Sequence, residues 1–219
     1  MSDKAFLFDL NGTVIDDMEF HARAWYDILN NDLHANLSWD EVKKEMYGKN
    51  EELLIRIFGE GYFTKEKMKE LSVEKERRYQ KEFTPHLKLI NGLDTFLERS
   101  FQQSIPMAIG TAAIMFNVDY IINGLHLHKY FKSIVSADDV AVSKPDPETF
   151  IKCADQLGIE YNKCIVFEDS PKGVESALRA GMQAVVIKTY HTMEEFAHLP
   201  NIIMAIDDYT DKTLQTLFL

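Results

Sequence analysis

The stretch that decides the fold is Ala5-Phe-Leu-Phe-Asp9-Leu-Asn-Gly-Thr13, a short apolar run that ends in a polar turn containing glycine. An apolar run of this length, bounded by turn residues, is typical of a strand buried on both faces. Five comparable runs follow, at 106–109, 133–135, 164–167, 184–187 and 202–206. Because fully buried strands of this kind are characteristic of parallel sheets, the sequence predicts an α/β fold.

Helical patterns separate the later runs. Residues 147–157 carry Phe150, Ala154 and Leu157 at helical spacing, and residues 171–180 form a second helical pattern. Gly181 follows the second pattern, and we expect it to end that helix as a C-cap. Strands that alternate with helices predict a parallel sheet with helices on both faces.

Residues 16–85 differ from the rest of the chain. They lack a strand signal, and apolar residues such as Trp25 and Leu29 recur at helical spacing. We therefore predict a helical insert at 16–85 that interrupts a core formed by 1–15 and 86–219.

Composition narrows the function classes. The 219-residue chain is 46% hydrophobic and has a formal net charge of −11, which makes it a poor partner for nucleic acid or an anionic membrane. Its two cysteines, Cys153 and Cys164, do not indicate a disulfide framework. We see no signal peptide and no apolar run of the ~20 residues that cross a bilayer. We expect a soluble, cytoplasmic monomer.

Chemically reactive side chains follow several predicted strands. Asp9 ends the first run, Gly110-Thr111 the second, and Glu168-Asp169 the run at 164–167, while Lys144 lies in a Ser-Lys-Pro-Asp-Pro loop. A single carboxylate after a strand is as often a turn former or helix cap as a catalyst. However, the carboxyl ends of parallel strands share one edge of the sheet, where ligands bind. We therefore expect these residues to form one site.

The charges of this set predict a metal-dependent phosphoryl-transfer site. Three converging carboxylates repel one another, and a hard divalent cation such as Mg²⁺ relieves that repulsion. Lys144, Thr111 and the backbone N–H groups of the turn at 10–12 can then bind phosphate oxygens. Asp9 is the candidate nucleophile, which would form an aspartyl-phosphate.

The same segments resemble the haloacid dehalogenase superfamily, and within it the beta-phosphoglucomutase-like phosphatases. The resemblance covers 4–189 and rests on the segments Phe-Asp9-Leu-Asn-Gly-Thr, Ile-Gly-Thr111, Ser-Lys144-Pro-Asp-Pro and Phe-Glu168-Asp-Ser-Pro-Lys-Gly-Val-Glu-Ser-Ala. It implies a Rossmann-like core with an inserted helical cap domain, in agreement with the insert at 16–85.

The resemblance also implies a role for each matching position. Asp9 is the expected nucleophile, and Thr111 and Lys144 are expected to assist it by binding phosphate. The expected magnesium ligands are Asp9, the backbone carbonyl of Asn11, Asp169 and, directly or behind them, Glu168. The expected substrate-binding residues are His21, Trp25, Tyr47, Gly48, Lys49, Thr111 and Ala112. For Trp25, packing inside the cap is the alternative.

Asn11 departs from the family pattern, which has an aspartate there that exchanges protons with the leaving group and the attacking water. An amide cannot take that role at neutral pH. Three explanations stay open. Asn11 is a substitution introduced to slow the enzyme, or it is natural and His21 or another cap residue shares the proton transfers, or the substrate has a good leaving group.

The predicted cap loop, Glu45-Met-Tyr47-Gly48-Lys49-Asn50-Glu51, also departs from the pattern. Tyr47 and Glu51 stand where the mutases carry basic residues that hold a second phosphate, and a carboxylate repels phosphate. We therefore rank a magnesium-dependent phosphatase for a small phosphorylated metabolite above a phosphosugar mutase. A phosphate-ligand binding protein impaired by Asn11 is the third alternative.

Overall fold

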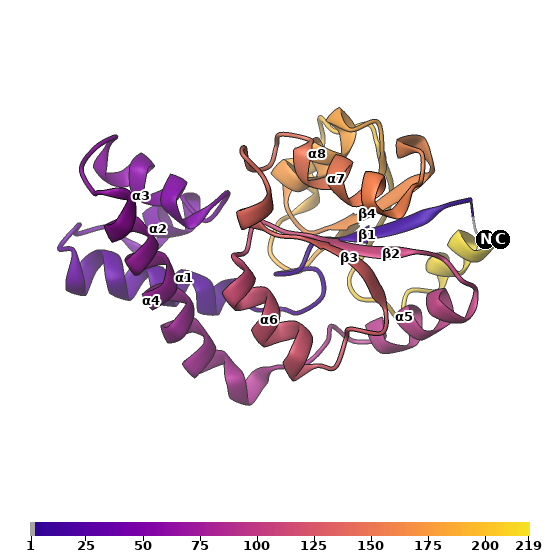
Figure 1. Cartoon of the computed structure of the whole chain (residues 1–219), viewed down its shortest axis with the longest axis horizontal. Helices are drawn as coiled ribbons and strands as arrows, with labels where there is room; N and C mark the ends of the chain where they lie inside the picture. Colours follow the sequence, from indigo (N-terminus) through magenta and orange to yellow (C-terminus); the bar gives the residue numbers. More distant parts are fainter. Residues whose placement is uncertain (1–2) are drawn as a thin grey trace. The chain divides into compact units, whose positions relative to one another are not determined.

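Figure 1 shows the protein as a computed structural model that describes residues 3–219. The chain divides into two compact units. One consists of the described residues up to Asp16 together with Lys88–Leu219, and the other is Asp17–Leu87. The predicted insert, 16–85, differs from the second unit by one residue at its start and two at its end.

The larger unit is built on a six-stranded sheet in which all strands run parallel, in the order β3-β2-β1-β4-β5-β6 (Figure 1). The strands are β1 (Ala5–Phe8), β2 (Met107–Gly110), β3 (Phe131–Val135), β4 (Cys164–Glu168), β5 (Gln183–Ile187) and β6 (Ile202–Ile206). This confirms the predicted α/β fold with a Rossmann-like core. The strand order reverses between β1 and β4, and the carboxyl ends at such a reversal form the usual ligand crevice.

The helical segments of this unit precede, connect or follow the strands after β1. They are α5 (Leu93–Gln102), α6 (Met115–Gly124), η3 (Ala137–Asp139), α7 (Glu148–Leu157), η4 (Tyr161–Lys163), α8 (Pro171–Arg179), η5 (Met193–Phe196) and η6 (Lys212–Phe218). Gly181 follows α8 with a φ of +75°, the left-handed conformation that ends helices and suits glycine.

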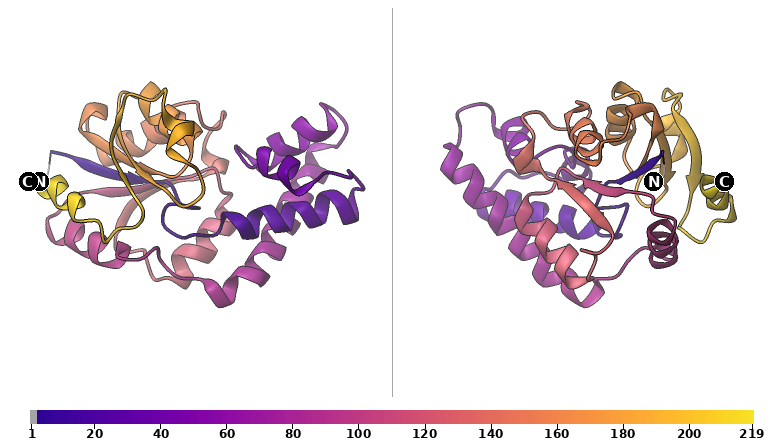
Figure 2. Two further views of the ribbon diagram at one scale, coloured as in Figure 1. Left: turned by 180° about the vertical axis from the view of Figure 1, so that it is seen from behind. Right: turned by 45° about the vertical axis from the view of Figure 1, so that its right-hand side comes forward.

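One face of the sheet packs against α7 and α8, and the other carries an aromatic cluster. On the face that packs against α7 and α8, Leu7 of β1 and Phe150 of α7 belong to one hydrophobic cluster. On the opposite face Phe8 stacks on Phe167 with ring centroids 4.6 Å apart, and Phe96 of α5 lies 5.2 Å from Phe167. The last segment, η6, lies beside α5 (Figure 2) and adds Phe218 at 5.2 Å from Phe96. Both faces are therefore dry, as the continuous apolar strands predict.

The smaller unit is entirely helical within Asp17–Leu87. It consists of α1 (Met18–Asp27), the π-helical turn η1 (Ile28–Asp32), α2 (Trp39–Lys44), α3 (Asn50–Phe58), α4 (Lys65–Phe83) and η2 (Thr84–His86). Arg78 of α4 forms ion pairs with Asp27, Asp32 and Glu74, which ties α4 to the end of α1 and to η1.

Trp25 lies in the core of this smaller unit. Its side chain is 1% exposed and packs in a cluster with Leu29 of η1, Leu54 of α3 and Leu71 of α4. Because the indole is enclosed by the unit's own helices, the structure favours the packing role for Trp25, and substrate binding by Trp25 stays a prediction.

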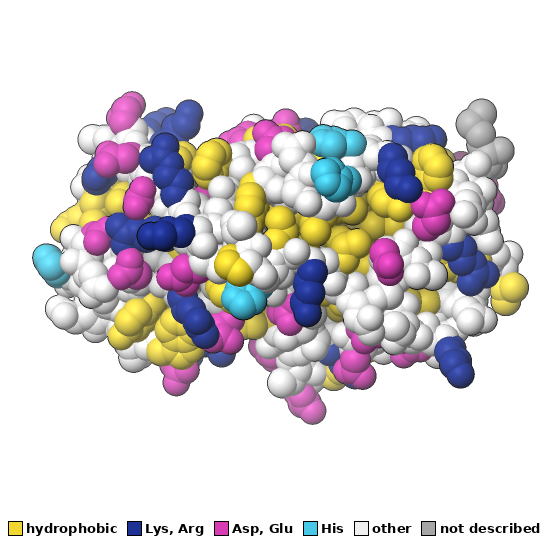
Figure 3. All heavy atoms as spheres, turned by 90° about the horizontal axis from the view of Figure 1, so that it is seen from below, with side chains coloured by type: hydrophobic (Ala, Val, Ile, Leu, Met, Phe, Trp, Pro, Cys, Tyr) yellow, Lys and Arg dark blue, Asp and Glu magenta, His cyan; other side chains and the backbone are white. Residues whose placement is uncertain are grey.

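None of the helices among residues 3–219 combines the length and the apolar character that spanning a membrane requires. On the face drawn in Figure 3, acidic and basic side chains are interspersed rather than gathered by sign.

The burial of Trp25 predicts a cost in stability. Trp25→Ala should lower the free energy of unfolding by about 3–5 kcal/mol, because it leaves a large cavity among Leu29, Leu54 and Leu71. Urea unfolding followed by circular dichroism measures this loss. Trp39→Ala is the matched control, since Trp39 is only partly buried and should give a clearly smaller loss. Equal losses at the two positions would contradict the assignment.

Candidate active site

The register of β1 and β4 places acidic side chains next to one another. Phe8 pairs with Phe167, so the residues that follow, Asp9 and Glu168, lie side by side at the carboxyl edge of the sheet. The Asp9 N–H donates to the Phe167 carbonyl at 2.9 Å, which extends the strand pairing and fixes the Asp9 backbone. One oxygen from each of Asp9, Glu168 and Asp169 lies within 4.8 Å of the other two, and all three residues are buried.

Lys144 brings one ammonium group into this acidic cluster. Its Nζ donates to Asp9 Oδ1 and to Glu168 Oε1, each at 2.7 Å, and to the Gly110 carbonyl at 3.0 Å. The lysine is 7% exposed, although it comes from a loop. That loop is held on both sides of Lys144. Glu148 Oε2 accepts from the N–H groups of Ala141 and Val142, and Ser176 donates to the Asp146 carbonyl.

Burial and mutual repulsion oppose ionisation of the carboxylates. Burial raises the pKa of Asp9 to about 7, a shift that Lys144 opposes and Glu168 increases. Burial, Glu168 and Asp9 raise the pKa of Asp169 well above its ordinary value. Burial alone would lower the pKa of Lys144, but Asp9 and Glu168 raise it, so the ammonium stays charged. When all three carboxyls are ionised, their charge exceeds that of the single ammonium, and a hard divalent cation with oxygen ligands would favour that ionised state.

Two glycines allow the acidic side chains to lie this close to the backbone. A Cβ atom at Gly12, whose φ is +79°, would lie 2.1 Å from Asp169 Oδ2. A Cβ at Gly173, in the first turn of α8, would lie 1.8 Å from Glu168 Oε1. Glu168 Oε2 also accepts from the N–H and hydroxyl of Ser170, the residue that caps α8. Glu168 is thus fixed by the start of α8, and Asp169 packs against the turn at Gly12.

Thr111, an expected phosphate-binding residue, follows β2 at the same edge of the sheet. Its N–H donates to the Val135 carbonyl at 2.9 Å, which continues the pairing of β2 with β3. Its Oγ1 accepts from the Ala113 N–H at 3.1 Å, so the hydroxyl keeps its own hydrogen for donation. Ala112, between them, is partly exposed.

Asn11 lies in the turn that follows β1 and is partly exposed. The Gly12 N–H donates to the Ile15 carbonyl at 2.8 Å, and the Val14 N–H donates to the Leu10 carbonyl at 2.8 Å. The turn is therefore closed by hydrogen bonds within its own backbone.

His21 lies in a buried polar network of the smaller unit rather than on a helix surface. Its Nε2 is 3.1 Å from Asp17 Oδ2, and its Nδ1 is 2.7 Å from Lys75 Nζ. Lysine can only donate, so these contacts require the tautomer with its hydrogen on Nε2. Lys75 also donates to Glu76 at 2.9 Å, and Tyr79 donates to Asp17 at 2.5 Å. Both ring nitrogens of His21 therefore have partners within the unit.

The network extends to α3 through Glu76. Burial alone would raise the pKa of the Glu76 carboxyl, but Lys75, His21 and the Asn50 amide together hold it below its usual value. Lys75 is not among the site residues that the sequence analysis names. The helical period could have shown that Lys75, Glu76 and Tyr79 share the face that packs on α1.

The loop that contains Tyr47, Gly48 and Lys49 is organised by Arg56, which sequence reasoning missed. The Arg56 guanidinium donates to the Glu45 carboxylate at 2.7 Å and to the carbonyls of Glu45 and Tyr47, and it lies over the Tyr47 ring at 3.7 Å. The Lys49 N–H donates to Glu52 at the start of α3. The positive charge of Arg56 is thus engaged by its own loop.

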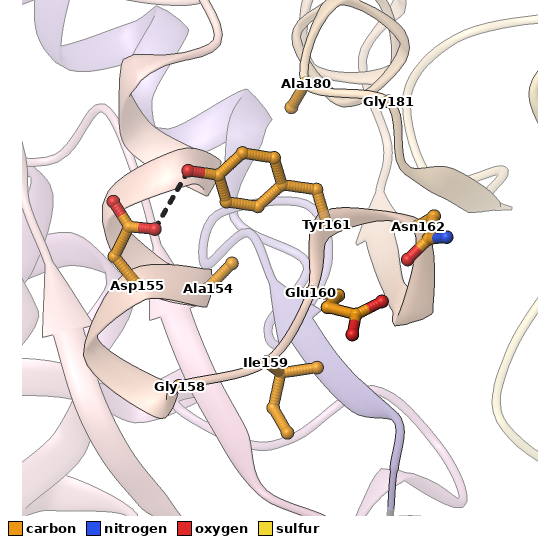
Figure 4. A pocket seen from close by; sticks show the side chains of 9 residues that line it. All are labelled: Ala154, Asp155, Gly158, Ile159, Glu160, Tyr161, Asn162, Ala180 and Gly181. Atoms are coloured by element: carbon orange, nitrogen blue, oxygen red, sulfur yellow. Dashed lines mark hydrogen bonds between the residues drawn. The ribbon is translucent and has the colours of Figure 1, made fainter.

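A separate hollow opens at the opposite edge of the sheet. It has a volume of about 690 Å³ and lies where α7 and α8 end, lined by residues such as Asp155, Tyr161 and Ala180 (Figure 4). Because it borders the start of β4 rather than its carboxyl end, it is distinct from the acidic cluster.

Comparisons with known proteins agree with this geometry. The family model for haloacid dehalogenase-like hydrolases matches residues 6–187. Fructose-1-phosphate phosphatase YqaB of Escherichia coli is 29% identical, over 83% of this chain and 95% of that protein. Beta-phosphoglucomutase of Bacillus subtilis is 31% identical, over 83% of this chain and 82% of that protein.

Solved structures give the same result. A crystal structure described as a haloacid dehalogenase (HAD) hydrolase of family IA, variant 3, from Entamoeba histolytica superposes with a TM-score of 0.84 at 31% identity, over 97% of this chain and 96% of that one. With the family model matching most of the sequence and the fold matching over nearly its whole length, this chain belongs to the haloacid dehalogenase-like hydrolase family.

Proposed function

We propose that this protein is a Mg²⁺-dependent phosphatase that hydrolyses a small phosphorylated carbohydrate through an aspartyl-phosphate on Asp9. The observation that carries the proposal is the buried trio of Asp9, Glu168 and Asp169 with the Lys144 ammonium bridging two of its members. The phosphatase and mutase relatives supply the substrate class.

The chemistry follows from the groups at the sheet edge. An Asp9 carboxylate oxygen attacks phosphorus, the ester P–O bond breaks, and the alcohol oxygen leaves with a proton that it must obtain from solvent or a donor. Water then attacks the same phosphorus, which releases inorganic phosphate and restores the Asp9 carboxylate. Lys144 and the Thr111 hydroxyl stabilise the phosphoryl oxygens.

Asp9, the Asn11 carbonyl and Asp169 are the proposed ligands of Mg²⁺, with Glu168 held against Lys144 beside them. The cation, when bound, supplies positive charge for the carboxylates and the transferred phosphoryl group. The oxygen-only donor set and its excess negative charge fit this ion.

Asn11 is expected to limit kcat for the hydrolysis of sugar phosphates. Since the amide cannot donate or accept the proton, Asn11→Asp should raise kcat with sugar phosphates by about 10²–10⁴-fold. Phosphate release at saturating Mg²⁺ measures this. Asn162→Asp, which adds the same charge at an exposed position on the opposite edge of the sheet, should leave kcat unchanged. An unchanged or lower rate in Asn11→Asp would refute the role assigned to position 11.

The raised pKa of Asp9 predicts a pH-dependent metal affinity. Below about pH 7 the metal-free carboxyl holds a proton that Mg²⁺ must displace, so the apparent Mg²⁺ affinity should rise by at least about tenfold between pH 6 and pH 8. Titration calorimetry in two buffers with different ionisation enthalpies gives both the affinity and the number of protons released. An affinity that does not change over this range, with no proton release at pH 6, would exclude Asp9 as a ligand with this pKa.

The same shift predicts the stability of the metal-free protein. Folded Asp9 keeps its proton above the pKa that it has in the unfolded chain. The free energy of unfolding should therefore fall as pH rises from about 4 to about 7, and Mg²⁺ should reverse that loss. Thermal unfolding with and without Mg²⁺ measures both effects.

A phosphosugar mutase is the second candidate, favoured by the Bacillus subtilis relative. In a mutase, the loop that contains Tyr47, Gly48 and Lys49 would have to hold a second phosphate. Arg56 of α3, which contacts this loop, instead forms an ion pair with Glu45. A screen of phosphate esters with Mg²⁺ separates the candidates. A phosphatase releases phosphate, a mutase yields an isomer and needs a bisphosphate activator, and a binding protein binds without turnover even after Asn11→Asp.

A further inference from the structure

Two hydroxyl groups from distant parts of the chain hold the turn that follows Asp9. Thr189 Oγ1 donates to the Gly12 carbonyl at 2.6 Å, and the Tyr209 hydroxyl donates to the Thr13 carbonyl at 3.0 Å. Both donors lie beyond residue 187, where the match to the family model ends. They therefore lie outside the segment that the family model matches.

Tyr209 is held firmly in place. The residue is 5% exposed, its N–H donates to the Asn91 carbonyl at 2.9 Å, and its ring lies 5.6 Å from Phe96 and 6.0 Å from Phe167. A Cβ on Gly92 would lie 2.8 Å from the backbone of this segment, which shows how closely it packs there. Burial, with Asp169 and Asp9 nearby, raises the pKa of the phenol, so the hydroxyl remains a donor.

The turn that these hydroxyls hold is packed against Asp169. The Asp169 carboxylate lies so close to Gly12 that no side chain would fit at position 12. Thr13 Oγ1 lies 3.4 Å from Asp169 Oδ1. A shift of the turn by a few tenths of an ångström would therefore change the position of Asp169 relative to Asp9.

Three successive peptide groups of the turn each have a fixed partner. The Gly12 N–H donates to Ile15, the Gly12 carbonyl accepts from Thr189, and the Thr13 carbonyl accepts from Tyr209. A trans peptide group is planar, with its N–H and C=O pointing in opposite directions. The bond at the Gly12 N–H therefore sets the direction of the Asn11 carbonyl, the proposed metal ligand.

We propose that Thr189 and Tyr209 are positioning residues that hold the Asn11–Thr13 turn against Asp169 and thereby set the protein's affinity for a divalent cation. The metal part of this proposal rests on the proposed function. The hydroxyls act through the backbone of the turn and touch neither metal nor substrate.

The test compares variants that keep side-chain shape and lose only the hydroxyl. Tyr209→Phe keeps the ring among Phe96 and Phe167, and Thr189→Val keeps the branched shape. Each should weaken Mg²⁺ binding by about 3–10-fold, the equivalent of one lost buried hydrogen bond. Thr189→Ser restores the hydroxyl and should restore the affinity. Calorimetric titration with Mg²⁺ alone is the readout.

Ser100→Ala is the matched control. Ser100 is fully buried in the same unit and donates to the Phe96 carbonyl at 2.8 Å, but it does not touch the turn. It should lower the melting temperature much as the other variants do and leave the Mg²⁺ affinity unchanged. Mg²⁺ affinities of Tyr209→Phe and Thr189→Val within twofold of the unaltered protein would overturn the proposal, as would an equal loss in Ser100→Ala.

Hydrogen exchange separates this proposal from the proposed function. In the metal-free protein, the amides of Gly12 and Val14 should exchange faster in both hydroxyl-deletion variants than in Ser100→Ala. If the unaltered protein binds no Mg²⁺, the proposed metal role fails, and faster exchange still supports the positioning role. Unchanged exchange would overturn it independently of any metal.

Discussion

The contact between Lys144 and the two carboxylates at the ends of β1 and β4 is the interaction on which the site depends. An ammonium group buried between Asp9 and Glu168 replaces its lost hydration with three hydrogen bonds, the third to the Gly110 carbonyl. Because these acceptors come from the ends of β1, β2 and β4, one side chain connects three neighbouring strands. Asp169 stays outside this contact, and burial, Glu168 and Asp9 together raise its pKa more than Lys144 lowers it.

Sequence was a good guide wherever a strand end fixed the position of a side chain. The apolar runs predicted all six strands, and the turn after each run located Asp9, Thr111 and the pair Glu168-Asp169. A parallel register then makes the meeting of Asp9 and Glu168 unavoidable. Lys144 lies in a loop, so its position depends on distant contacts such as that of Ser176 with Asp146, and no strand end or helical period places it.

The smaller unit was harder to predict because helical periodicity gives a residue's face but not its partner. Trp25 and His21 both lie on the inward face of α1, yet one meets leucines and the other meets Asp17 and Lys75. The pairing of α1 with α4 decides between these outcomes, and no local pattern encodes it. Arg56 escaped notice for the same reason, since it acts on a loop that precedes its own helix.

The charges of Asp9, Glu168, Asp169 and Lys144 also bear on why residue 11 is an asparagine. The turn is closed by backbone bonds and by the hydroxyls of Thr189 and Tyr209. An aspartate there would add a fourth carboxylate to a site in which burial already raises the pKa of Asp9 to about 7. Asparagine avoids that added repulsion and keeps the backbone carbonyl. Under the proposed function, the amide would keep the carbonyl ligand of the cation and lack the proton carrier, so metal binding and proton transfer would be physically separable at this turn.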